Sequence, residues 1–120
     1  MKILVVDDSK AMRAIVKRSL ASLERFSGAE ILEAADGRQA LETCEQEAPD
    51  LVISDWNMPE MSGIELLQAL GGEGGRPTFG FVTSESTPEM HERARASGAA
   101  FLVSKPFTPE SLGGALDGAV

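Results

Sequence analysis

Residues 3–9 read Ile-Leu-Val-Val-Asp-Asp-Ser, a short apolar run that ends in two acids. A run of aliphatic residues without a polar interruption is typical of a strand buried on both faces, as strands are in a parallel sheet. Similar runs follow at residues 29–32, 51–54, 79–82 and 100–103. The sequence therefore predicts a buried strand at each of these positions.

The segments between these runs have the features of amphipathic helices. Residues 62–65, Ser-Gly-Ile-Glu, form a capping box, and Thr-Pro-Glu at residues 87–89 and 108–110 supplies a cap, a proline at the first helical position and an early acid. Apolar residues recur at helical spacing in the first two segments, at Met12, Ile15, Val16, Leu20 and Leu23, and at Ala40, Leu41 and Cys44.

Strands and helices therefore alternate along the whole chain, as five βα units. With right-handed crossovers this order predicts an α/β fold, a doubly wound five-stranded parallel sheet between two layers of helices. Residues 71–75, Gly-Gly-Glu-Gly-Gly, are the only linker-like segment and are interpreted as a flexible turn before the fourth strand. We expect a single domain over residues 1–120, without an effector domain.

The charge balance restricts the partners of this domain. The chain has 19 Asp and Glu against 11 Lys and Arg, a formal net charge of −8. A surface of that sign repels nucleic-acid phosphates and anionic lipids, so we expect neither DNA nor membrane binding. Cys44 is the only cysteine, and the first apolar run is too short for a signal peptide. These features favour a cytoplasmic location.

Polar side chains follow the predicted strands at the points where the strands end. The first strand ends at Asp7 and Asp8, the third at Asp55, the fourth at Thr83-Ser84 and the fifth at Ser104-Lys105. In an open parallel sheet, ligands bind at the carboxyl ends of the strands. The fold is therefore expected to gather these distant residues at one edge.

Three carboxylates and one lysine in a small site leave an excess of negative charge. Like charges a few ångströms apart repel by roughly 1 to 4 kcal/mol per pair near a surface, so a cation is expected in the cluster. Hard oxygen ligands favour Mg²⁺, with Mn²⁺ as a possible substitute. Asp55 lies on the predicted middle strand, which makes it the best candidate for a nucleophile that accepts a phosphoryl group. Lys105 then offsets the developing charge, and Thr83 or Ser84 hydrogen-bonds the phosphoryl oxygens.

Four blocks of the sequence resemble the signature blocks of response-regulator receiver domains. These are residues 5–9 (VVDDS), 55–63 (DWNMPEMSG), 82–85 (VTSE) and 105–108 (KPFT). The resemblance spans the chain and is strongest to stand-alone, CheY-like chemotaxis regulators. It implies a (βα)5, flavodoxin-like receiver fold and a switch in two-component signalling that is not a conventional enzyme.

The resemblance also implies roles for individual residues. Asp55 is then the phosphoacceptor, and the metal site consists of Asp7, Asp8, Asp55 and the main-chain carbonyl of Asn57. Thr83 grips the phosphoryl group, and Lys105 pairs with it and precedes a cis peptide bond. The implied partners are a histidine kinase or histidine phosphotransfer protein as donor, and a motor switch, a kinase or a relay protein as target. The protein is expected to be a monomer.

Two features depart from the family pattern. Receivers often carry Tyr or Phe three residues before the lysine, where this chain has Leu102 beside Phe101. This argues against an aromatic switch and leaves open a smaller shift of the loop before the fourth helix. The last helix contains Gly113, Gly114 and Gly118, each of which costs about 1 kcal/mol relative to alanine.

The same residues also fit other interpretations. Asp8-Ser9 fits a helix cap, Trp56 a half-exposed packing residue, Cys44 a core position and His91 a solvated side chain. An aspartyl-phosphate phosphatase or phosphotransferase usually has a second acid two residues after the nucleophile, where this chain has Asn57. A flavin-binding carrier needs a hydroxyl- and glycine-rich phosphate loop after the first strand, where Asp7 and Asp8 would repel the flavin phosphate. A receiver that no longer accepts phosphate is disfavoured because the acidic set is complete.

Overall fold

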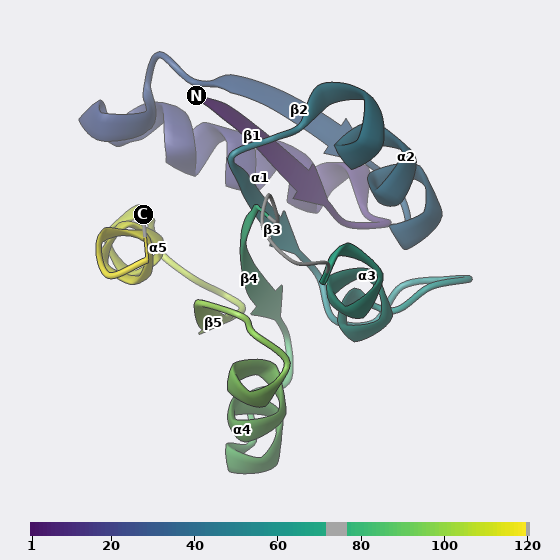
Figure 1. The fold of residues 1–120 in the computed structure, drawn as a ribbon. Coiled ribbons are helices and arrows are strands. Elements are labelled where there is room, and N and C mark those ends of the chain that lie inside the picture. The colour runs from purple at the N-terminus through teal and green to yellow at the C-terminus, as the bar shows by residue number, and fades with distance from the viewer. Residues whose placement is uncertain (72–76, 120) are drawn as a thin grey trace.

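The computed structural model describes residues 1–71 and 77–119, in which strands and helices alternate (Figure 1). All strands belong to one parallel sheet with the order β2-β1-β3-β4-β5. The predicted doubly wound, flavodoxin-like α/β fold is confirmed. The elements are β1 (Lys2–Val6), α1 (Lys10–Ser22), a 3-10 turn (Glu24–Phe26), β2 (Glu30–Ala34), α2 (Gly37–Glu47), β3 (Leu51–Ser54), α3 (Gly63–Leu70), β4 (Thr78–Thr83), α4 (Pro88–Ala96), β5 (Phe101–Ser104) and α5 (Pro109–Asp117).

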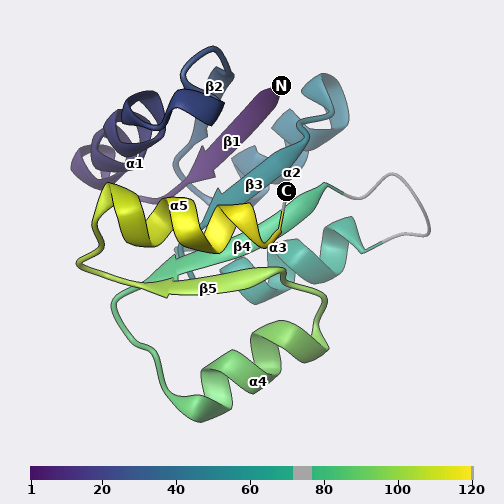
Figure 2. The same cartoon turned by 90° about the vertical axis from the view of Figure 1, so that its left-hand side faces the viewer.

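The helices cover both faces of the sheet. Helices α1 and α5 lie side by side on one face, and α2, α3 and α4 lie on the other (Figures 1 and 2). Because successive side chains of a strand point to opposite faces, each strand contributes to two separate hydrophobic clusters. The cluster under α2, α3 and α4 is called the α2–α4 cluster, and the cluster under α1 and α5 is called the α1–α5 cluster. On β4, for example, the Phe81 side chain belongs to the α2–α4 cluster and the Val82 side chain to the α1–α5 cluster.

The prediction that every strand is buried on both faces is correct for the inner strands and wrong for the two edges. All residues of β3 are buried, whereas β2 buries only Ala34 and β5 buries only Val103. An edge strand has one hydrogen-bonded neighbour, and its side chains are less completely covered by helices. The bounds of β2 also lie one to two residues further along the chain than the predicted run 29–32.

The helix starts agree with the sequence signals. Ser62 and Glu65 form the capping box of α3, and Thr87 and Thr108 cap α4 and α5 ahead of a proline. At α1 the cap is Ser9, whose Oγ accepts from the Met12 amide at 3.2 Å. The predicted turn at residues 71–75 lies mostly outside the described residues. None of the helices in the described ranges is long and apolar enough to cross a membrane.

Candidate functional site

Three aspartates meet at the carboxyl edge of the sheet, on neighbouring strands. Asp7 follows β1 and Asp55 follows β3, and the Asp55 amide donates to the Val6 carbonyl at 2.9 Å. One carboxylate oxygen from each of Asp7, Asp8 and Asp55 lies within 4.8 Å of the others. Asp7 is 4% exposed, whereas Asp8 is open to solvent and Asp55 is intermediate. The structure thus brings together the three acids that the sequence singled out.

Lys105 reaches this cluster from β5, across the width of β4. Its Nζ lies 3.0 Å from Asp7 Oδ2 and 3.5 Å from Asp55 Oδ2, and its side chain is 15% exposed. The Lys105 amide donates to the Thr83 carbonyl at 2.8 Å, which fixes the loop against the end of β4. The Lys105–Pro106 peptide bond is cis, as expected. Lys105 therefore neutralises one of the three carboxylate charges.

The environment of Asp55 favours its protonated form. Burial raises the pKa of the Asp55 carboxyl, and the charge of Asp7 acts in the same direction. The Lys105 ammonium and the Trp56 amide, which donates to Asp55 Oδ1 at 2.7 Å, oppose this rise in pKa. The Trp56 contact occupies Oδ1 and leaves Oδ2, on the Lys105 side, as the less restrained oxygen.

Thr83 and Asn57 also lie at the carboxyl edge of the sheet, Thr83 at the end of β4 and Asn57 in the loop that follows β3. Thr83 ends β4 and is 1% exposed, and its Oγ1 accepts from the Glu85 amide at 3.3 Å. Asn57 lies two residues after Asp55 and is exposed. A hollow of about 280 Å³ beside the site is lined by Trp56, Asn57, Glu85, Glu89, Met90 and Arg93. Asn57 and Glu85 therefore line a common space.

The interpretation of Trp56 as half-exposed is wrong, because its side chain is only 8% exposed. The indole packs on Phe81, with ring centroids 4.7 Å apart. Helix α3 starts directly against this pair, and the Gly63 amide donates to the Trp56 carbonyl at 2.8 Å. A Cβ on Gly63 would lie 2.3 Å from the Asp55 carbonyl oxygen and 2.6 Å from the Phe81 ring. The close approach of α3 explains the burial of Trp56.

Arg13 is a residue beside the site that was not predicted from the sequence. Its Nη1 donates to the Asp7 carbonyl at 2.6 Å, and its Nε donates to Glu33 Oε1 at 3.0 Å. The signal that could have found it is the composition of α1, which has four basic residues and no acid. With no acidic partner on the same helix, a largely buried arginine must bond elsewhere.

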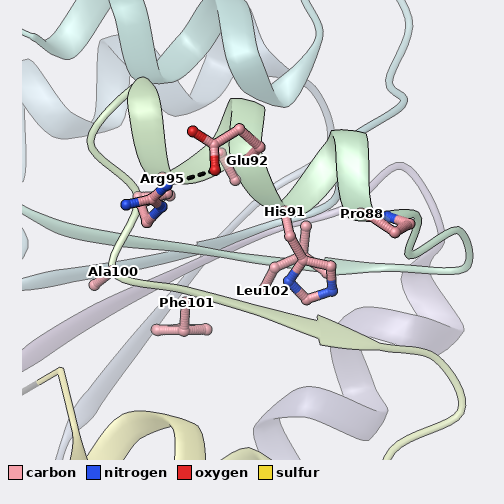
Figure 3. Close-up of a pocket in the computed structure, with 9 residues that line it drawn as sticks. Pro88, His91, Glu92, Arg95, Ala100, Phe101 and Leu102 are labelled. Carbon is pink, nitrogen blue, oxygen red and sulfur yellow. Dashed lines mark hydrogen bonds and ion pairs between the residues drawn. The ribbon is translucent and has the colours of Figure 1, made fainter.

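Leu102 lies on the α4 side of β5, at the position where receivers often carry an aromatic ring. Its neighbour Phe101 points to the opposite face (Figure 3), where its ring covers Gly80. A groove of about 400 Å³ between α4 and β5 is lined in part by His91, Arg95 and Leu102. His91 is exposed, as predicted, and its Nε2 lies 2.8 Å from Ser86 Oγ. Cys44 is half-buried against the α2–α4 cluster.

The donor set of the acidic cluster fits a hard divalent cation. Asp7, Asp8 and Asp55 offer carboxylate oxygens, and Lys105 supplies one positive charge against three negative ones. Magnesium prefers oxygen ligands and binds through a few carboxylates while keeping several waters. The exposed position of Asp8 leaves room for such waters. The cluster can therefore hold Mg²⁺ at the carboxyl edge of the sheet.

Comparison with known proteins defines the class to which this fold and site belong. The sequence model of the response regulator receiver domain family matches residues 3–117 of this chain. The chain belongs to the response regulator receiver domain family.

Within that family, its relatives include chemotaxis regulators of the CheY type. It is 37% identical over 116 residues to chemotaxis protein CheY1 of Helicobacter pylori, covering 93% of this chain and 90% of that protein. The CheY homolog of Campylobacter jejuni is also 37% identical, with 93% and 86% covered. The structure of Vibrio cholerae CheY4 superposes with a TM-score of 0.87 at 36% identity, covering 99% of this chain and 98% of that one.

Proposed function

We propose that the protein is a phosphorylation-dependent switch of a two-component system, of the chemotaxis type, with Asp55 as the phosphoacceptor. The observation that carries the proposal is the contact of Lys105 with both Asp7 and Asp55, at 3.0 and 3.5 Å, beside three convergent carboxylates. A nucleophilic carboxylate, acidic metal ligands and a lysine are the groups that transfer of a phosphoryl group to aspartate requires. The names of the CheY relatives support the assignment to chemotaxis.

Asp55 Oδ2 is the proposed attacking oxygen, because Oδ1 already accepts from the Trp56 amide at 2.7 Å. Attack on a phosphohistidine forms the carboxylate O–P bond and breaks the N–P bond, and the imidazole leaves with the donor protein. Lys105 shifts from the carboxylates toward the phosphoryl oxygens and offsets their charge. Thr83 Oγ1, which accepts from the Glu85 amide at 3.3 Å, turns to donate to the same oxygens.

Asp7, Asp8, Asp55 and the Asn57 carbonyl are the proposed ligands of Mg²⁺, and Mn²⁺ is expected to substitute. When bound, the ion neutralises charge on the carboxylates and on the incoming phosphoryl group. Asp7 is suited to its role because its Oδ1 accepts from the Ser9 amide at 2.9 Å and is held in place. Asp8 is exposed, so water could complete the coordination of a bound ion there.

The output of the switch is protein–protein contact. The donor is a histidine kinase or a histidine phosphotransfer protein, and the target is a motor switch, a kinase or a relay protein. Leu102 replaces the aromatic ring that many receivers move, so we propose that the loop between β4 and α4 carries the change. Thr83 is the last residue of β4 before that loop, and Thr87 ends the loop as the cap of α4. The protein acts in the cytoplasm as a monomer.

The test is phosphorylation by a small phosphodonor with Mg²⁺. Intact mass spectrometry is expected to show one added phosphoryl group, with a change in Trp56 fluorescence, and neither in Asp55→Asn nor in EDTA. Asp50→Asn is the matched control, because Asp50 lies at the opposite end of β3 and binds the Lys2 amide through Oδ2 at 2.8 Å. An adduct that persists in Asp55→Asn would refute the assignment. Steady turnover of unrelated phosphate esters would instead favour a phosphatase.

A further inference from the structure

Arg13 connects three elements next to the acidic cluster. Its side chain is 14% exposed, and its guanidinium donates to the Asp7 carbonyl at 2.6 Å and to Glu33 Oε1 at 3.0 Å. Arg13 belongs to α1 and Glu33 to β2, and Asp7 follows β1. A guanidinium is a rigid planar fork, so two hydrogen bonds from it fix the relative position of both acceptors.

The hydrogen bond from Arg13 holds the Asp7 carbonyl, and other contacts hold the Asp7 amide and both of its carboxylate oxygens. The Asp7 amide donates to the Ala34 carbonyl at 3.1 Å, Oδ1 accepts from the Ser9 amide at 2.9 Å, and Oδ2 lies 3.0 Å from Lys105 Nζ. The Asp7 carbonyl belongs to the peptide plane that joins Asp7 to Asp8. The direction of that carbonyl determines where the Asp8 side chain starts. Asp8 itself is exposed, so its position depends on this backbone.

We propose that Arg13 is a positioning residue for the acidic cluster. By holding the Asp7–Asp8 peptide plane, it keeps the two carboxylates in a geometry that binds a divalent cation. The inference rests on the proposed function, because it takes Mg²⁺ as the ion. Arg13 acts through the backbone of Asp7 and does not bind the ion.

Arg13 could instead influence cation binding through its charge, and that explanation predicts the opposite change in cation affinity. A positive charge near a cation site repels the cation, so a purely electrostatic role predicts tighter binding when Arg13 is neutralised. Glu33 pairs with Arg13 at 3.0 Å and with Lys17 at 3.1 Å, so two basic side chains of α1 share its one negative charge. Lys17 is therefore a matched control: it has the same charge, the same helix and the same acidic partner, and its Nζ bonds Glu33 Oε2 rather than the backbone of Asp7.

The first measurement is the Kd for Mg²⁺, obtained by titrating the protein with Mg²⁺ while Trp56 fluorescence is monitored. Loss of a residue that orients metal ligands typically weakens metal binding, so the Kd for Mg²⁺ is expected to rise about 10-fold in Arg13→Gln and in Arg13→Lys. In Lys17→Gln the Kd is expected to stay the same or fall. Unchanged or tighter binding in both Arg13 variants would overturn the proposal.

The second measurement needs no metal. Amide hydrogen exchange of Asp8 and Ser9 in EDTA is expected to be faster in the Arg13 variants and unchanged in Lys17→Gln. If the wild-type protein shows no response to Mg²⁺, the proposed function fails, while faster exchange would still support the positioning role. If the wild-type protein binds Mg²⁺ and the affinity is unchanged in both Arg13 variants, the positioning role is refuted and the proposed function stands. Should both Arg13 variants unfold, Glu33→Ala removes one contact of the fork, and the same two measurements apply with a smaller expected change.

Discussion

Asp55 combines burial with a like-charged neighbour, and both raise the pKa of its carboxyl above the ordinary value of 3.8. Between the unfolded and the folded pKa, the folded protein therefore holds more protons than the unfolded chain. By linkage, the contribution of Asp55 to stability falls as pH rises through that window. Without metal, the site is a source of instability at neutral pH.

We therefore expect Asp55→Asn to stabilise the metal-free protein at pH 7. Like charges at about 4 Å repel by roughly 1 to 4 kcal/mol, so removal of one carboxylate is expected to raise the free energy of unfolding by about 1 kcal/mol. The gain is expected to shrink as pH falls toward 4, because Asp55 takes up a proton more readily in the folded protein than in the unfolded chain. Thermal unfolding in EDTA at the two pH values measures the effect. A gain that is larger at pH 4 than at pH 7 would contradict the assigned direction.

At the scale of single elements, α5 is a weak helix whose glycines differ in their surroundings. A Cβ on Gly113 would meet Leu23 Cδ2 at 3.1 Å, whereas a Cβ on Gly114 would have no neighbour within 4 Å among the described residues. Gly113 is buried against α1, and Gly114 is exposed. The close packing of α1 on α5 thus explains one glycine, and nothing in the structure explains the other.

Gly114→Ala is expected to stabilise the protein. The substitution lowers the entropy of the unfolded chain and is expected to contribute about 0.5 to 1 kcal/mol, or an increase in Tm of about 2 to 6 °C. Gly113→Ala is the matched variant, and a smaller gain or a loss is expected because Leu23 must move. Differential scanning calorimetry distinguishes the two. Equal gains at both positions would show that α5 does not pack on Leu23 as described.

At the scale of the whole molecule, the fold and the acidic cluster were predictable for a common reason. Buried parallel strands leave continuous apolar runs, and the residue that follows each run must lie at the carboxyl edge. The incomplete burial of β2 and β5 was not predictable from the runs alone, because it depends on the order of strands in space. The burial of Trp56 requires Phe81 and the start of α3, and the contacts of Arg13 require a backbone carbonyl. Such partners leave no local pattern in the sequence.

The acidic site also gives the whole molecule an expected response to metal. A ligand that binds only the folded state stabilises it, by about 2.7 kcal/mol at a hundredfold excess over Kd. We expect MgCl₂ to raise the Tm more than NaCl at matched ionic strength, and Asp8→Asn to reduce that difference. Calorimetry across a concentration series tests this. An equal response to both salts would mean that only screening of the net charge of −8 is at work.

Because the sheet separates the two hydrophobic clusters, substitutions in one cluster are expected to change the free energy of unfolding independently of substitutions in the other. Leu20 is buried in the cluster beneath α1 and α5, and Leu67 in the cluster beneath α2, α3 and α4. Substitutions at residues that share no partners contribute additively, within about 0.3 to 0.5 kcal/mol. Stabilising changes made in one layer can therefore be combined with changes in the other. One side of the domain can diverge to suit a new partner while the opposite side preserves the folded state.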